Sequence, residues 1–241
     1  MDEMHYPNAP IIEAIVDIRA RAAKSTDEAT FTTFAEALQD SYAQAVPLYA
    51  HQLTFDTSHP EQMEATGERT GIRLIRNDGK CQVVANKEGF AFSLLAPYTR
   101  WSEFIEAALP VWTNYLTHLK PETFSRVALR YVNLFRFTDS SVSLPRYFTV
   151  YPQVEAIDSM FSQHQLRVRM KLDETTAAIV TQAHLPASDE VHILLDLDVF
   201  KERDLPADAA GIWECLNPLR DHKNWVFRQC LTFEGEQRIR K

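Results

Sequence analysis

Apolar and polar residues alternate with a period of two near the start of the chain. The positions that would face a core are Ile12, Ala14, Val16 and Ile18. Between them stand Glu13, Asp17 and Arg19, which share the opposite face because successive strand residues point to opposite sides. The pattern therefore predicts a β-strand with one apolar face and one charged face.

Helical spacing then appears twice in the first 120 residues. Aromatic and aliphatic residues spaced three to four apart predict a helix with Thr26 as its N-cap and Pro47 as the residue that ends it. A longer amphipathic helix is predicted over residues 101–119, with a broad apolar stripe on one side. The longest strand candidate of the chain, residues 124–137, follows directly.

The segment between these helices has the spacing of short strands. A strand is predicted over residues 51–56, and a polar connection follows from Thr57 to Thr70. Asn77-Asp78-Gly79 then predicts a hairpin turn, because Asn and Gly tolerate positive φ. A further strand over residues 89–96 completes the run.

The second half repeats the order of strands followed by helix. Three strands in meander spacing are predicted over residues 164–172, 176–184 and 191–200. Residues 207–234 read as one closing helix, or two broken near Pro218. Strand runs followed by single long helices predict an α+β fold with antiparallel sheets, built from two related halves.

A segment that is richer in Ser and Pro separates these elements into two groups. We expect an N-terminal α+β half over residues 1–137, a connection over residues 138–160 and a C-terminal α+β half over residues 161–241. In each half, strands are followed by a long packed helix. The 241 residues suffice for a sizeable core, and we expect both halves to form one cooperative domain.

Composition narrows the possible partners. The chain holds 25 Lys and Arg against 33 Asp and Glu, a formal net charge of −8. Such a chain is repelled by nucleic acid and by anionic membranes, so we expect no nucleic-acid or membrane partner and instead a basic protein. Three widely spaced cysteines and an acidic N-terminus without a signal-peptide pattern predict a cytoplasmic protein with reduced thiols.

Motifs that support common catalytic chemistry are missing. The six glycines form no G-x-G, which excludes a Walker loop or a dinucleotide fingerprint, and G-x-S-x-G and H-E-x-x-H are absent. The eight histidines are scattered without metal-ligand spacing. We therefore expect no catalytic residues, no metal and no cofactor, and the sequence favours a protein that is not an enzyme.

Charged residues nevertheless line several predicted strand faces. Besides the first strand, the rows are Arg126, Arg130 and Arg136; Gln165, Arg167, Arg169 and Lys171; and Asp196 with Asp198. One reading is a charged tunnel for a metal and a polyphosphate, as in triphosphate tunnel enzymes, although their E-x-E-x-K is replaced here by E-A-I-V-D-I-R. The other is a solvent-facing sheet surface whose opposite charges pair across strands, for example the first-strand acids with Arg130.

The opening Y-P-N-A-P-I-I-E-A-I-V-D-I-R resembles the start of a sporadically distributed bacterial family of about this length with no established activity. The resemblance extends over W-S-E-F-I-E-A-A-L-P-V-W and L-R-Y-V-N-L-F-R-F, and more loosely over the closing W-V-F-R-Q-C-L-T-F-E. It implies a small cytoplasmic bacterial protein, often an accessory one, with no catalytic residues to carry over.

We therefore expect a non-enzymatic protein-binding module, an immunity or antitoxin protein that neutralises a basic bacterial toxin encoded nearby. The partner-binding candidates are four acids at turns of the second-half meander: Asp173, Glu174, Asp189 and Glu190. Such turns can fall at the same end of a sheet, where they would focus a negative patch. The alternatives are an enzyme that binds a phosphorylated or polyphosphate substrate on the charged sheet face, and a structural or regulatory partner of an adjacent gene product.

Overall fold

The computed structural model describes residues 6–55, 63–138, 141–153, 163–185 and 190–240. It has an α+β fold with a single antiparallel sheet of nine strands. The strands are β1 (Ile11–Arg21), β2 (Gln44–Phe55), β3 (Met63–Ile75), β4 (Cys81–Asn86), β5 (Gly89–Leu95), β6 (Thr123–Phe137), β7 (Gln165–Lys171), β8 (Thr176–Leu185) and β9 (Val191–Lys201). The helices are α1 (Glu28–Glu36), α2 (Trp101–Leu119), α3 (Leu144–Tyr147), α4 (Ala209–Glu214), α5 (Leu216–Gln229) and α6 (Phe233–Arg240).

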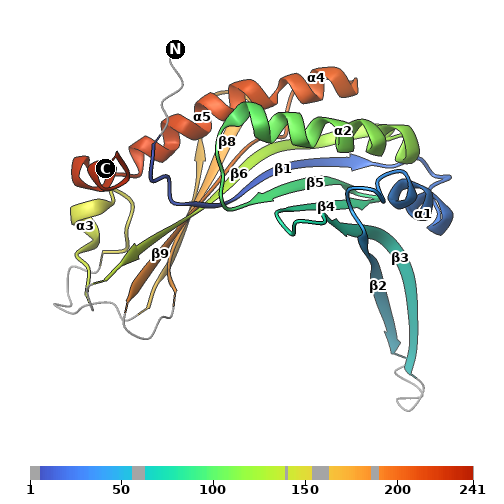
Figure 1. Cartoon of the computed structure of the whole chain (residues 1–241), viewed down its shortest axis with the longest axis horizontal. Helices are drawn as coiled ribbons and strands as arrows, with labels where there is room; N and C mark the ends of the chain where they lie inside the picture. The colour runs from blue at the N-terminus through green and yellow to red at the C-terminus, as the bar shows by residue number, and fades with distance from the viewer. Residues whose placement is uncertain (1–5, 56–62, 139–140, 154–162, 186–189, 241) are drawn as a thin grey trace.

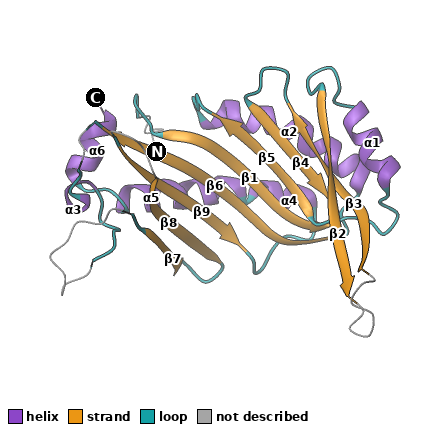
Figure 2. Ribbon diagram, turned by 90° about the horizontal axis from the view of Figure 1, so that it is seen from below, coloured by secondary structure: helices purple, strands orange, loops and turns teal. Residues whose placement is uncertain are grey.

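The two longest helices, α2 and α5, lie with α4 on one face of the sheet (Figure 1). The shorter α1 lies near the β2–β3 hairpin, and α3 and α6 lie together at the other end of the molecule. Seen from the opposite side, the central strands have no helix in front of them (Figure 2). The sheet therefore has one face that is packed under helices and one that is not.

The strand order is β2-β3-β4-β5-β1-β6-β9-β8-β7. Two long strands at the centre, β1 and β6, pair with each other over most of their lengths. On its outer side β1 pairs with β5, and β6 pairs with β9 along eleven residue positions from Val127 to Phe137. The sheet is thus continuous from the first half of the chain into the second.

The alternating pattern of β1 is realised as predicted. Ala14, Val16 and Ile18 are at most 1% exposed and point into the core beneath the helices. The core also crosses from one half to the other: the ring of Trp112 on α2 stacks on Trp213 of α4, with ring centroids 5.9 Å apart. The halves therefore share both a sheet and an apolar core.

Each half follows a similar path. A long strand leads into a short helix and then into an antiparallel meander. The last strand of the meander pairs with the long strand that opened the half, and a long helix on the covered face follows. The meander has four strands in the first half (β2 to β5) and three in the second (β7 to β9). The sequence prediction placed β6 in the first half of the chain. In this comparison β6 is instead the long strand with which the second half begins.

Several boundaries differ from the sequence prediction. The first helix is capped by Asp27 rather than Thr26, since the Asp27 carboxylate accepts a hydrogen bond from the Thr30 amide. Pro47 lies inside β2 instead of ending that helix, which an edge strand tolerates because one side of it needs no amide donor. The C-terminal helical segment is interrupted at Cys215, ahead of Pro218.

Within the polar connection predicted from Thr57 to Thr70, residues 63–70 are strand, and residues 57–62 lie outside the described ranges. β3 begins at Met63, and it pairs with β2 through to Ile75 with one irregularity. The sequence did not predict this part of β3 because its residues are mostly polar, and periodicity identifies a strand chiefly through the apolar residues on one face. No helix in the described ranges is long and apolar enough to cross a membrane.

We predict that the chain unfolds in one transition. The continuous β1–β6–β9 pairing and the Trp112–Trp213 contact mean that neither half retains its core alone. After limited proteolysis between residues 138 and 160, the two pieces should stay associated and melt together, with coincident transitions by circular dichroism and tryptophan fluorescence. Two fragments that separate, each with its own melting transition, would contradict this.

Candidate functional site

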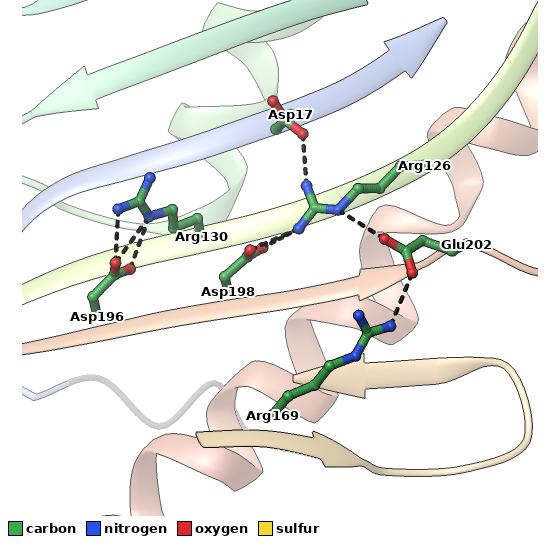
Figure 3. A network of polar contacts seen from close by, with 7 residues as sticks. All are labelled: Asp17, Arg126, Arg130, Arg169, Asp196, Asp198 and Glu202. Carbon is green, nitrogen blue, oxygen red and sulfur yellow. Dashed lines mark hydrogen bonds and ion pairs between the residues drawn. The ribbon is translucent and has the colours of Figure 1, made fainter. Parts of the chain in front are cut away.

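The charged side chains of β1, β6 and β9 meet on the helix-free face of the sheet (Figure 3). Antiparallel register brings them together: Asp17 lies opposite Ala128 of β6, and Ala128 in turn lies opposite Phe200 of β9. Arg126 lies on the same face of β6 as Ala128, two residues away. Its guanidinium carbon is 4.4 Å from the centre of the Phe200 ring.

Arg126 is the centre of this cluster. Its Nη1 donates to the Asp17 carboxylate at 2.6 Å, and its Nη2 donates to both oxygens of Asp198 at 2.6 and 2.7 Å. Its Nε lies 3.8 Å from Glu202. The Arg126 side chain is only 8% exposed, so one guanidinium, largely withdrawn from water, links carboxylates that β1 and β9 hold on either side of it.

Two further arginines complete the arrangement. Arg169 on β7 donates to Glu202 at 3.0 Å, and its guanidinium carbon lies 5.2 Å from the centre of the Phe200 ring. Arg130 binds Asp196 through two nitrogens, with Nε–Oδ1 at 2.9 Å and Nη2–Oδ2 at 2.7 Å. These hydrogen bonds from Arg130 to Asp196 raise the pKa of Arg130, against the effect of its partial burial.

We call these seven residues the ion-pair network: Asp17, Arg126, Arg130, Arg169, Asp196, Asp198 and Glu202. The prediction that opposite charges pair across strands is confirmed. The first-strand acid Asp17 binds Arg126, whereas Arg130 binds Asp196. The charge of the other first-strand acid, Glu13, contributes to raising the pKa of Arg130. Sequence spacing could not show this, because the partners come from strands far apart in the chain.

The network limits what this face can bind. A phosphate at Arg126 would have to displace carboxylates that already hold its guanidinium at 2.6 to 2.7 Å. Arg130 is already bound to Asp196 through Nε and Nη2, although its side chain is 47% exposed. Asp196 and Asp198 are likewise engaged by arginines. In the part of the chain that the structure describes, no group of three or more His, Cys, Asp or Glu side chains could hold a metal ion.

The three described members of the predicted partner-binding acids, Asp173, Glu174 and Glu190, lie at two different turns. Asp173 and Glu174 lie in the β7–β8 turn, whereas Glu190 precedes β9, and Asp189 lies outside the described residues. Consecutive turns of a meander alternate between the ends of its strands, so these turns are separated by the ten-residue length of β8, which is about 30 Å. Asp173 and Glu174 therefore lie at the other end of β8 from Glu190, and partner binding by these acids stays a prediction.

Asp173 has a structural role in its turn. Its Oδ1 accepts hydrogen bonds from the amides of Thr175 and Thr176, both at 2.8 Å, and its other oxygen lies 3.2 Å from His222 Nε2. Burial opposes ionisation of this carboxyl, but the hydrogen bonds and His222 bring the pKa of Asp173 down to about 2. Glu190 pairs with His192 at 2.9 Å, and Glu174 is exposed.

A buried lysine on the covered face was not predicted from the sequence. Lys223 on α5 is 9% exposed, and its ammonium nitrogen lies 3.8 Å from the centre of the Tyr131 ring. Burial, with a smaller contribution from Arg220, lowers the pKa of Lys223 from its usual 10.5 to about 7. The helical spacing of α5 places residue 223 on the apolar stripe with Leu219 and Val226, a signal that could have identified it.

No protein-family model matches the chain, and no curated protein matches it. The fold and the site must therefore support any functional argument on their own, and the resemblance of the opening stretch stays a prediction.

We predict that removing Arg126 is costly. Arg126→Met keeps the apolar stem over Phe200 but leaves Asp17 and Asp198 without their shared cation, whereas Glu202 keeps Arg169. The free energy of unfolding should fall by about 2–3 kcal/mol, because carboxylates left unpaired in a partly buried site repel each other. Arg21→Met is the matched control, since the Arg21–Glu122 pair is exposed at 3.6 Å and should contribute less than about 0.5 kcal/mol. Urea denaturation measures both, and equal losses would contradict a special role for Arg126.

We also predict a pH dependence that Lys223 causes. The unfolded chain holds a proton on this lysine up to about pH 10, whereas the folded chain loses it near pH 7. Stability should therefore rise with pH above 7, by up to about 1.4 kcal/mol per pH unit for one proton. Lys223→Met removes this proton uptake on unfolding and should flatten the slope between pH 7 and pH 8.5. Parallel stability curves for the two proteins would contradict the prediction.

Proposed function

We propose that the chain is a non-enzymatic protein-binding module of the immunity or antitoxin type, and that it binds a basic partner through the helix-free face of the sheet. The observation that carries the proposal is the ion-pair network on that face. It fixes seven charged side chains in defined positions on a sheet surface that no helix covers.

Such a surface suits protein recognition for two physical reasons. Side chains that are already held by partners lose little conformational freedom on binding, which lowers the cost of association. A fixed mosaic of charges also discriminates between partners, because like charges brought together cost free energy. The net charge of −8 adds a long-range attraction for a cationic protein.

The turn acids contribute to this attraction from the two ends of β8. Among the described turn acids, the carboxylate of Asp173 is bound by backbone amides of its own turn, whereas no such bond holds those of Glu174 and Glu190. The alternative function, an enzyme for a phosphorylated substrate on the sheet face, has weaker support, because Arg126 and Arg130 already bind carboxylates.

We further infer that the two halves arose by duplication. The support is the shared order of strand, short helix, returning meander and long helix, together with the antiparallel β1–β6 pairing that joins the halves. The sheet would then be a joined pair of smaller antiparallel sheets. After such a duplication, the ion-pair network would have formed around the paired strands β1 and β6, where the two smaller sheets join.

We predict a complex that depends on this face. The chain is co-expressed with the products of the genes adjacent to its own and pulled down at low and high salt. Ser93→Trp places a bulky ring on the helix-free face, because Ser93 lies opposite Ile15 of β1, and it should weaken the complex. Glu174→Lys combined with Glu190→Lys should weaken it as well, more strongly at low salt.

Thr117→Trp is the control for Ser93→Trp, since Thr117 is exposed on α2 on the other side of the sheet. It should leave the complex intact. The absence of a complex with any neighbouring product, or a complex that is indifferent to salt and to Ser93→Trp, would count against the proposal.

A further inference from the structure

A second feature lies away from the ion-pair network, at the end of the molecule where α3 and α6 meet the opening segment (Figures 1 and 2). Here residues 7–10, the end of β6, α3 and α6 surround an open cleft of about 840 Å³. That volume is within the range of small-molecule sites, which spans roughly 300–1,000 Å³. The cleft is therefore large enough for a small metabolite.

Positive charge gathers in this cleft. Three arginines from three different elements line it: Arg136 from β6, Arg146 from α3 and Arg238 from α6. One acid, Glu234, is also part of the lining and is paired with Arg146. Three positive charges and one negative charge leave a formal charge of +2, in a chain whose net charge is −8.

The arginines are held in different ways. Arg238 donates to the backbone oxygen of Arg136 at 2.6 Å, and its guanidinium carbon lies 4.5 Å from the centre of the Phe137 ring. Arg136 is exposed, and no carboxylate of the described residues forms an ion pair with it. Its guanidinium thus keeps its donors for a ligand. The Arg238 guanidinium, which is fixed by its neighbours, lines the same cleft.

The walls of the cleft are tied together by backbone hydrogen bonds. The amide of Leu134 donates to Pro10 O at 2.8 Å, and the amide of Asn8 donates to Ile239 O at 3.2 Å. α6 packs closely on α3 at Gly235, where an added Cβ would lie 2.1 Å from Tyr147 O. The Pro7–Pro10 segment is thus a fixed wall, and the exposed side chain of Asn8 adds a hydrogen-bonding group to it.

We infer that this cleft binds a phosphate group of a small phosphorylated molecule, with Arg136 and Arg238 as the principal ligands. Guanidinium groups match the geometry of tetrahedral oxyanions and bind them through charge-assisted hydrogen bonds. A doubly charged phosphate would also balance the formal charge of the lining. The inference goes beyond the proposed function and does not depend on it.

Calorimetric titration with inorganic phosphate tests the inference, with succinate as a dicarboxylate of equal charge in a parallel titration. Saturable phosphate binding is expected at constant ionic strength, tighter than that of succinate. Arg136→Gln and Arg238→Gln should each weaken phosphate binding about tenfold or more, as expected for the loss of a charge-assisted hydrogen bond. Thermal melts establish that each variant is folded, and Arg136→Gln alters no backbone contact of the cleft.

Arg19→Gln is the matched control, because Arg19 is an exposed arginine of β1 outside the cleft. Its phosphate affinity should stay within about twofold of the unmodified protein. No saturable binding up to millimolar phosphate, tighter binding of succinate, or equal losses in Arg136→Gln and Arg19→Gln would each overturn the inference.

Discussion

The antiparallel pairing of β6 with β1 on one side and β9 on the other is the constraint on which the rest of the structure depends. It joins segments that are distant in sequence into one sheet. One face of these strands packs under α2 and α5, where Leu129 and Tyr131 are at most 1% exposed. Because strand residues alternate between faces, the same register sets the charged residues of all three strands side by side on the other face.

Arg126 shows what this register makes possible. A guanidinium that is 8% exposed would be costly to withdraw from water by itself, yet here it binds Asp17 and Asp198 and lies over the Phe200 ring. Asp17 of the opening strand thus has its partner within the sheet, and the face presents an ordered set of charges. The proposed recognition function rests on this order, while the arginine-lined cleft at the end of the molecule suits a different, smaller ligand.

Local patterns allowed much of the fold to be predicted. The period-two alternation of β1 and the apolar stripe of α2 both depend on residues close in sequence, and both elements form where they were expected. The prediction failed where tertiary position overrides local preference. Pro47 is compatible with a strand only because β2 is at the edge of the sheet, and the polar N-terminal part of β3 is a strand because it pairs with β2.

The sequence predicted the type of interaction at the site but not which residues take part in it. Charge pairing across strands follows from alternation, but the partners of Arg126 and Arg130 depend on a register between strands separated by 66 to 109 residues. The turn acids were grouped because they were expected at turns of one meander, although the length of β8 separates Asp173 and Glu174 from Glu190. The cleft was missed entirely, because Arg136, Arg146 and Arg238 share no sequence pattern and meet only where α6 packs on α3.

The central claim is that Arg126 couples β6 to the acids of its neighbouring strands. A double-mutant cycle of Arg126→Met and Asp198→Asn tests it most directly, with the free energy of unfolding measured by urea denaturation for the four proteins. For residues in one ion-pair network we expect a coupling energy of about 1–3 kcal/mol, with the double variant losing less stability than the sum of the single variants. A coupling energy near zero would contradict the account, because the two side chains would then stabilise the sheet independently.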